Sequence, residues 1–423
     1  MFRIWIIAMS LVAMVALAGA ARANTFSFVS DRLTLDPGVT PGAFLTDANV
    51  AAVDAFLARQ PVKVVKIARD VSPATIAAIY GKYKIDYTFA DFEGPDAVER
   101  TRSLMSRIKA SSVTGPAVSA NRAFVGNYHF FPTVVDRTAP ALPSPYANYF
   151  ATGINMATED LYPGSPGFRN PASGDSTAPN IRSALFTLPI ERMTLTNVTL
   201  PAGHAHVPYV NRFNNWGNLS LDTDRNAANG YQFVTLNQLP SRGDFRAQVL
   251  HYRLRGADGV QGLDGGVVGY TQQQFQADIA AGWNGTAEVR EILADPNARR
   301  ATLDTQVKTD GVLKSLENAG VVVSGAYSEI KGKLVLLVSN LDESAHAVSM
   351  PARIGGRTVS GNFNVDAGAH QILEFGASGA TWNLVEGHVV FEDHNRAGTG
   401  VPEPGMGAVV AGGALMMLRR RRC

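Results

Sequence analysis

The chain has 423 residues, of which 46% are hydrophobic and 17% charged, and its formal net charge is +2. This composition is typical of a globular chain with an ample core. Four of the positive charges are the arginines at 419–422, and the remaining sequence has no basic patch that would indicate nucleic-acid binding. The only cysteine, Cys423, excludes a disulfide bond within the chain.

The N-terminal segment, residues 1–23, has the three parts of a secretory signal. Arg3 supplies a small positive region, residues 4–17 are apolar, and Ala21-Arg22-Ala23 offers a cleavage site with small residues at the required spacing. We therefore expect the protein to be exported and this segment to be removed. Retention of the segment as an uncleaved membrane anchor is the alternative.

Residues 24–319 show apolar runs of strand length that alternate with segments of helical periodicity. Such alternation predicts parallel βαβ units, and about seven or eight of them would close a (β/α)8 TIM-like barrel. The predicted fold class is therefore α/β. The expected strands cover residues 26–29, 62–68, 87–92, 123–131, 153–158, 206–212 and 259–263, and the expected helices cover residues 47–59, 72–83, 96–110, 178–195, 244–255, 271–281 and 285–294.

From residue 320 the pattern changes to short apolar runs separated by turn residues, with no helical periodicity between them. This pattern predicts a small antiparallel β-sandwich domain over residues 320–392. The expected strands cover residues 321–328, 333–341, 345–350, 357–363 and 370–375, with further strand structure within residues 381–392. Residues 393–400 are polar and contain glycine, which is typical of a linker.

The body of the chain resembles glycoside hydrolases that combine a barrel with a C-terminal β-sandwich. The segment DFRAQVLHYRLRGADG, residues 244–259, is similar to the last helix and strand of such barrels, and GKLVLLVSN, residues 332–340, is similar to a strand of the following β-domain. The resemblance implies a polysaccharide or oligosaccharide as partner and hydrolysis without a cofactor.

Four carboxylates follow two of the predicted strands at the edge where a barrel carries its active site. Asp91 and Glu93 close the strand 87–92, and Glu159 and Asp160 close the strand 153–158. Glycoside hydrolysis needs one protonated and one ionised carboxyl group, so we predict Glu93 and Glu159 as the catalytic pair. A separation of about 5–5.5 Å would indicate a retaining reaction and about 6.5–9.5 Å an inverting one. Asp91 and Asp160 are predicted to bind substrate, and helix capping or pairing with arginine would explain the same residues.

Further candidates for substrate binding lie in two aromatic and amide-rich segments. His129 is in the run YHFF near a strand end, and Trp216 lies in NRFNNW, which follows the strand 206–212. Rings of this kind stack on the apolar faces of sugars, although core packing is an equal explanation. Asn211 and Asn214 suit hydrogen bonding to sugar hydroxyl groups.

His204 and His206 present the His-x-His spacing that places two imidazoles on one face of a strand. A metallohydrolase is therefore an alternative. However, no acidic or histidine partners lie at a recognisable spacing, and we predict no bound metal. The sequence contains no phosphate loop, dinucleotide fingerprint or nucleophile elbow.

The C-terminal segment, residues 401–423, combines three features in a fixed order. Pro402-Glu403-Pro404 precedes an apolar segment, residues 405–418, and Arg419, Arg420, Arg421 and Arg422 follow it. This order resembles the bacterial PEP-CTERM sorting signal, which implies a membrane-held tail, processing by an exosortase, and delivery to the cell surface or extracellular matrix. The apolar segment is shorter than the about 20 residues of a typical membrane-spanning helix.

Together these patterns predict an exported, surface-sorted protein with a glycoside-hydrolase-like barrel that acts on polysaccharide. A non-catalytic carbohydrate-binding or structural protein on the same scaffold is the alternative. The sequence leaves the sugar, the linkage and catalysis itself open.

Overall fold

The structure is a computed structural model that describes most of the body of the chain. The described residues are 25–33, 38–92, 95–112, 124–127, 145–158, 186, 189–190, 193–194, 196–197, 200–210, 241–262, 271–301, 321–341, 344–349, 353–360 and 362–392. The predicted signal, linker and sorting tail lie outside these residues. Within them, no helix has the length and apolar character that crossing a membrane requires.

A nine-stranded sheet forms the first half of the molecule, in the order β7-β6-β5-β4-β3-β2-β1-β9-β8. The edge strands β7 and β8 are separated in the chain only by Val207 and Pro208. Val207 donates its backbone N–H to the Ala157 carbonyl, and the Pro208 carbonyl accepts from Gln261. The sheet therefore curls, and one short segment bonds to both of its ends. The strands are β1 (Thr25–Ser30), β2 (Thr40–Leu45), β3 (Val64–Ile67), β4 (Tyr87–Ala90), β5 (Phe124–Asn127), β6 (Met156–Ala157), β7 (Ala205–His206), β8 (Tyr209–Val210) and β9 (Gly259–Gly262).

The first strand departs from the predicted βαβ alternation. β1 runs antiparallel to both of its neighbours, β2 and β9, whereas the other pairs in this sheet are parallel. A parallel pair needs a crossover connection, but the described residues between β1 and β2 contain no helix. The direction of β1 follows from this short connection.

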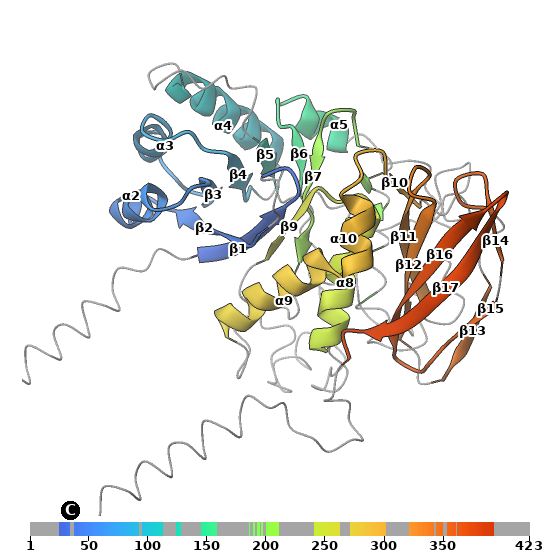
Figure 1. Cartoon of the computed structure of the whole chain (residues 1–423). Helices are drawn as coiled ribbons and strands as arrows, with labels where there is room; N and C mark the ends of the chain where they lie inside the picture. Colours follow the sequence, from blue (N-terminus) through green and yellow to red (C-terminus); the bar gives the residue numbers. More distant parts are fainter. Residues whose placement is uncertain are drawn as a thin grey trace, which may run out of the picture.

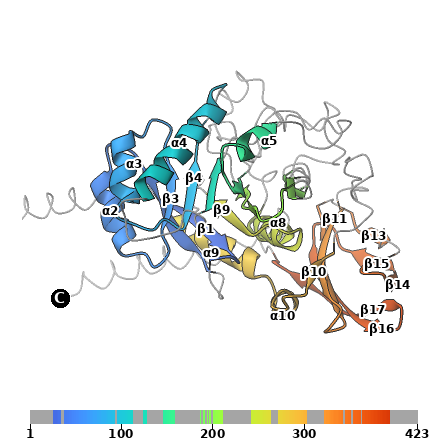
Figure 2. The same cartoon turned by 90° about the horizontal axis from the view of Figure 1, so that it is seen from above.

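Helices pack on the outer face of the curled sheet (Figures 1 and 2). The predicted start of α3 is confirmed, because the Ser72 side chain accepts a hydrogen bond from the Thr75 N–H and Pro73 occupies the first turn. The helix α8 begins earlier than predicted, since Ser241 and Asp244 form a capping box. The helices are α2 (Val50–Ala58), α3 (Pro73–Tyr80), α4 (Ala97–Ser112), α5 (Pro145–Phe150), α8 (Arg242–Leu254), α9 (Gln272–Asn284) and α10 (Ala287–Leu293).

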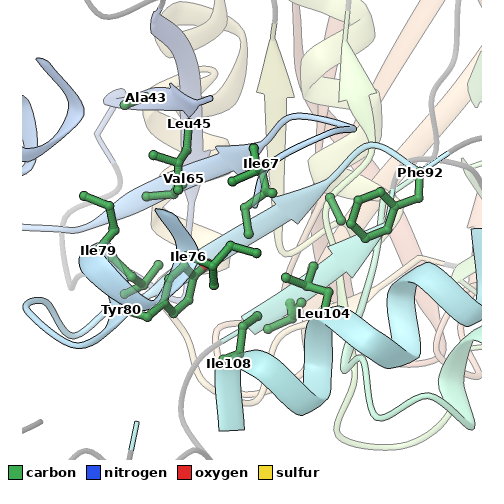
Figure 3. Close-up of a cluster of buried hydrophobic side chains, with 14 of the residues drawn as sticks. Ala43, Leu45, Val65, Ile67, Ile76, Ile79, Tyr80, Phe92, Leu104 and Ile108 are labelled. Atoms are coloured by element: carbon green, nitrogen blue, oxygen red, sulfur yellow. The ribbon is translucent and has the colours of Figure 1, made fainter. Parts of the chain in front are cut away.

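The alternation of residues along each strand separates an outer core from an inner one. The outward side chains of β2 and β3 pack against α2, α3 and α4, as Figure 3 shows for Leu45, Val65, Ile76 and Leu104. The inner core consists largely of aromatic rings, with Phe28 and Phe89 at 5.4 Å between ring centroids. Complete burial stabilises the fold by about 1.5–3 kcal/mol for each large apolar side chain.

The C-terminal part is a six-stranded sheet, in the order β10-β11-β12-β16-β17-β14, with a two-stranded sheet β13-β15 beside it. Several strands agree with those predicted, but the expected strand 357–363 is divided between β14 and β15 in different sheets, residues 381–390 form one strand, and β14 pairs in parallel with β17. The two sheets share a core that includes Phe363, Phe375 and Trp382. The strands are β10 (Arg299–Arg300), β11 (Val321–Ser328), β12 (Lys333–Asn340), β13 (His346–Ser349), β14 (Thr358–Ser360), β15 (Asn362–Val365), β16 (His370–Ser378) and β17 (Thr381–Val390). A β-bulge interrupts the β16–β17 pairing beside Val385.

The helices α8 and α10 lie between the curled sheet and the C-terminal sheet (Figures 1 and 2). α8 contacts β9 on one side and β11 and β16 on the other. The connection between the two halves is therefore a packed interface in which one helix touches both sheets.

Candidate functional site

Of the residues predicted to act on substrate, only Asp91 lies within the described part of the chain. The roles of the others stay predictions, because Glu93, His129, Glu159, Asp160, Asn211, Asn214 and Trp216 lie outside the described residues.

Asp91 follows β4 at the carboxyl edge of the parallel strands, as predicted. It forms an ion pair with Lys66, with 3.1 Å between Nζ and Oδ2. The Lys66 side chain is only 4% exposed, whereas that of Asp91 is 34% exposed. Asp91 therefore compensates the charge of a buried cation. Because its own side chain is partly exposed, it can also accept a hydrogen bond from another donor.

Lys66 extends this site to a residue that the sequence analysis did not identify. It alternates with Val65 and Ile67, which belong to the outer core, so its side chain lies on the inner side of β3. Its Nζ also lies 5.1 Å from the centre of the Phe44 ring, within the range of a cation–π contact. The available signal was a single charged residue inside the otherwise apolar run VVKIA.

Two fully buried polar side chains lie near the same edge of the sheet. Thr158 directly follows β6, and Gln261 lies on β9. The Thr158 hydroxyl and both polar atoms of the Gln261 amide lack a hydrogen-bond partner in the structure as described. Because a buried polar group without a partner costs free energy, these atoms are suited to bind a hydroxyl group or water.

The register places Thr158 in the same row as Asp91. Ala90 pairs with Asn127, and Asn127 pairs with Ala157, so the next residues along the outer two strands are Asp91 and Thr158. Two strand spacings separate their backbones by about 10 Å.

The opposite, amino end of the parallel strands carries ion pairs of a structural kind. Arg32 donates to Asp258 at 2.9 Å, and Arg253 pairs with Asp31 at 3.0 Å. Burial raises the pKa of the nearby Tyr87 hydroxyl to about 12, so this group stays protonated at neutral pH. These contacts hold β1 and its turn against α8 and β9. Because the charged groups at this end pair with one another, the candidate site is the carboxyl edge.

The His204–His206 pair shows no metal site within the described residues. The imidazole of His204 packs edge-on against Phe150, with ring centroids 4.6 Å apart. Among the residues that the structure describes, no group of three His, Cys, Asp or Glu side chains could hold a metal ion.

A second polar constellation has the residue types of a catalytic triad. The Ser339 Oγ lies 2.8 Å from His370 Nδ1, and His370 Nε2 lies 2.9 Å from Asp244 Oδ1. However, Ser339 and Asp244 are completely buried and His370 is 4% exposed. A nucleophile must reach its substrate, so this arrangement between α8 and the C-terminal sheet is not an active site.

Neither a family model nor a curated protein matches this sequence. Three glycoside hydrolases are among the solved structures that resemble it. α-Galactosidase I from Mortierella vinacea matches with 12% identity and a TM-score of 0.38, over 78% of this chain and 80% of that chain. A GH30 endoxylanase from Clostridium papyrosolvens C71 matches with 11% identity and a TM-score of 0.20, over 74% and 96%. A glycoside hydrolase family 30 subfamily 8 xylanase from Clostridium acetobutylicum matches with 10% identity and a TM-score of 0.19, over 71% and 92%. At this level of similarity, the assignment of a function depends on the geometry of the chain itself.

Proposed function

We propose that this protein binds a polysaccharide or oligosaccharide at the carboxyl edge of its curled sheet and hydrolyses a glycosidic bond there. The scaffold would be a (β/α)8-type barrel in which β1 runs antiparallel. The observation that carries this proposal is the half-exposed Asp91 carboxylate held by the buried Lys66 at this edge. Thr158 and Gln261 add buried donors and acceptors to the same inner face.

In this proposal the carboxylates divide into two roles. Asp91 accepts a hydrogen bond from a sugar hydroxyl group and so positions the ring. Glu93 and Glu159 act as the general acid and as the nucleophile or base that hydrolysis requires. Asp160, His129, Asn211, Asn214 and Trp216 complete the binding surface, and no cofactor takes part.

The address of the protein is a second part of the proposal. The signal at residues 1–23 and the tail at residues 401–423 support export, membrane attachment through the tail, processing by an exosortase and display at the cell surface.

The test is hydrolysis of a panel of plant, algal and bacterial polysaccharides by the wild-type protein and by Glu93→Gln and Glu159→Gln. Loss of activity by a factor of about 100 or more in both variants supports the enzyme and the pair. Activity that survives both substitutions rejects these two residues.

A carbohydrate-binding protein without catalysis is the second candidate. The Lys66–Asp91 ion pair favours this candidate, because its two charged groups can bind sugar hydroxyl groups without taking part in bond cleavage. Retention on one polysaccharide, with no products released from any, would decide for this candidate.

A further inference from the structure

A continuous chain of buried hydrogen bonds joins α8 to three strands of the C-terminal sheet. Arg255 Nε lies 2.6 Å from Ser324 Oγ, which lies 2.7 Å from His251 Nδ1. His251 Nε2 lies 2.8 Å from Ser339 Oγ, and the chain continues through His370 to Asp244. We call this the His251–His370 chain, and its members are Asp244, His251, Arg255, Ser324, Ser339 and His370. Each of them is buried.

One arrangement of the protons satisfies every contact of the His251–His370 chain. Arg255 can only donate, so Ser324 accepts from it, and in this arrangement the Ser324 hydroxyl donates its own proton to His251 Nδ1. The remaining proton of a neutral His251 is then on Nε2 and is donated to Ser339. Ser339 in turn donates to His370 Nδ1, and His370 Nε2 donates to the Asp244 carboxylate. All the contacts are satisfied when both imidazoles are neutral and carry their proton on Nε2.

An additional proton breaks this arrangement. If His251 gains a proton on Nδ1, it donates toward Ser324, which already accepts from Arg255. The Ser324 hydroxyl proton then has no acceptor within the chain, and a buried imidazolium faces the guanidinium of Arg255. A buried donor left without an acceptor destabilises the closed arrangement.

Within the described residues, the neighbours of the His251 imidazole are two serines and an aromatic ring. The serines are Ser324 on β11 and Ser339 on β12, and the ring is that of Phe186, with centroids 5.5 Å apart. Among the described residues, the charged or titratable groups in the chain besides His251 are Asp244 on α8, Arg255 at its end and His370 on β16. Burial, followed by the charge of Arg255, holds the pKa of His251 well below its usual value of 6.5.

We propose that the His251–His370 chain is a proton-sensitive latch, which holds α8 against the C-terminal sheet while His251 is neutral and releases it when His251 is protonated. α8 leads directly into β9, which carries Gln261, so release of the latch loosens one wall of the curled sheet. The latch does not depend on the activity at the carboxyl edge.

The test is hydrogen exchange of the full-length protein between about pH 7.5 and about pH 5, with each rate divided by the intrinsic rate at that pH. Opening of α8, β11 and β12 is expected to increase about tenfold for each pH unit below 6.5, since one proton is bound on opening. The helices α2 to α4 are not expected to follow this change. A wild-type response that is absent, or equal in α2 to α4, would overturn the latch.

The variant His251→Gln separates the latch from ordinary packing. Its side-chain amide donates to Ser339 but gains no proton, so the opening of α8 should lose its dependence on pH even if it is faster throughout. The control is His346→Gln on β13. Its imidazole lies outside the His251–His370 chain, with Nε2 3.4 Å from Ser344 Oγ, and the variant should keep the wild-type pH response. An unchanged pH response in His251→Gln would contradict the latch.

A measurement on the wild-type protein covers the case in which His251→Gln does not fold. The 15N resonances of the histidine side chains distinguish the Nε2–H form, the Nδ1–H form and the imidazolium. The neutral Nε2–H form of His251 at about pH 7 is expected. An imidazolium at His251 at this pH would reject the proposed proton positions and the latch with them.

Discussion

Lys66 and Asp91 differ in exposure, and this difference determines what each substitution costs. Asp91→Asn would remove a counter-charge of the buried cation, and we expect a loss of about 2–3 kcal/mol in the free energy of unfolding. Lys66→Met would leave only a half-exposed carboxylate, which water can solvate, and should cost less than about 1 kcal/mol. Urea unfolding of both variants measures the difference.

The double variant Lys66→Met/Asp91→Asn is the control for this asymmetry. It removes both charges, so it should recover most of the stability that Asp91→Asn alone loses. Equal costs for the two single variants would show that the ion pair is not buried on the lysine side.

The sequence pattern predicted one residue of the Lys66–Asp91 ion pair and did not reveal the other. Asp91 could be predicted because a carboxylate at a strand end is a local pattern. Lys66 could not, because its neighbours Val65 and Ile67 are apolar and the pattern does not show which face of a fully buried strand is occupied. The same holds for Gln261, which lies in a run of small and apolar residues.

The elements α8 and α9 cross closely because of Gly282. A Cβ at this position would lie 2.6 Å from the backbone carbonyl oxygen of Arg246. We expect Gly282→Ala to lower the free energy of unfolding by about 1–2 kcal/mol, since α9 must shift and the higher helix propensity of alanine offsets only part of the cost.

Thermal or urea unfolding tests this prediction, with Gln273→Ala as the matched control. Gln273 lies on the exposed face of the same helix, so its substitution should change stability by less than about 0.5 kcal/mol. A Gly282→Ala protein as stable as Gln273→Ala would mean that the two helices are not in such close contact.

The elements themselves were predicted best where their signals are local. The start of α3 depends on Ser72 and Pro73 alone, and the long strands β11 and β12 contain the runs VVV and LVLLV. The pairing of β1 with β9 instead joins residues that are more than 200 positions apart in the chain. Local patterns contain no information on such a pairing.

The whole molecule should lose stability in acid because of His251. Its folded-state pKa lies below 6.5, so the unfolded state binds more protons below that pH. The contribution of His251 is therefore complete above pH 6.5 and falls by about 1.4 kcal/mol for each pH unit below it.

Urea unfolding at a series of pH values measures this loss. The free energy of unfolding of His251→Gln should fall less steeply with decreasing pH than that of the wild type. The difference in slope should correspond to one bound proton, whatever the absolute stability of the variant. Parallel curves would assign the acid sensitivity to other groups. The sequence could not reveal this property, because Asp244 and His370 are 126 residues apart and meet only when both halves have folded.

The bulge beside Val385 has a consequence for how copies of the protein behave at high concentration. Val385 is 71% exposed on β17, and β14 pairs only with residues 381–383 of this strand. A straight apolar edge would be a template on which a second chain could add a strand, and stacking of this kind leads to fibres. The extra residue breaks the spacing of the backbone groups, and the neighbouring Glu386 adds a charge. The bulge and the charge therefore disfavour hydrogen bonding between this strand edge and the sheet of another copy at high concentration.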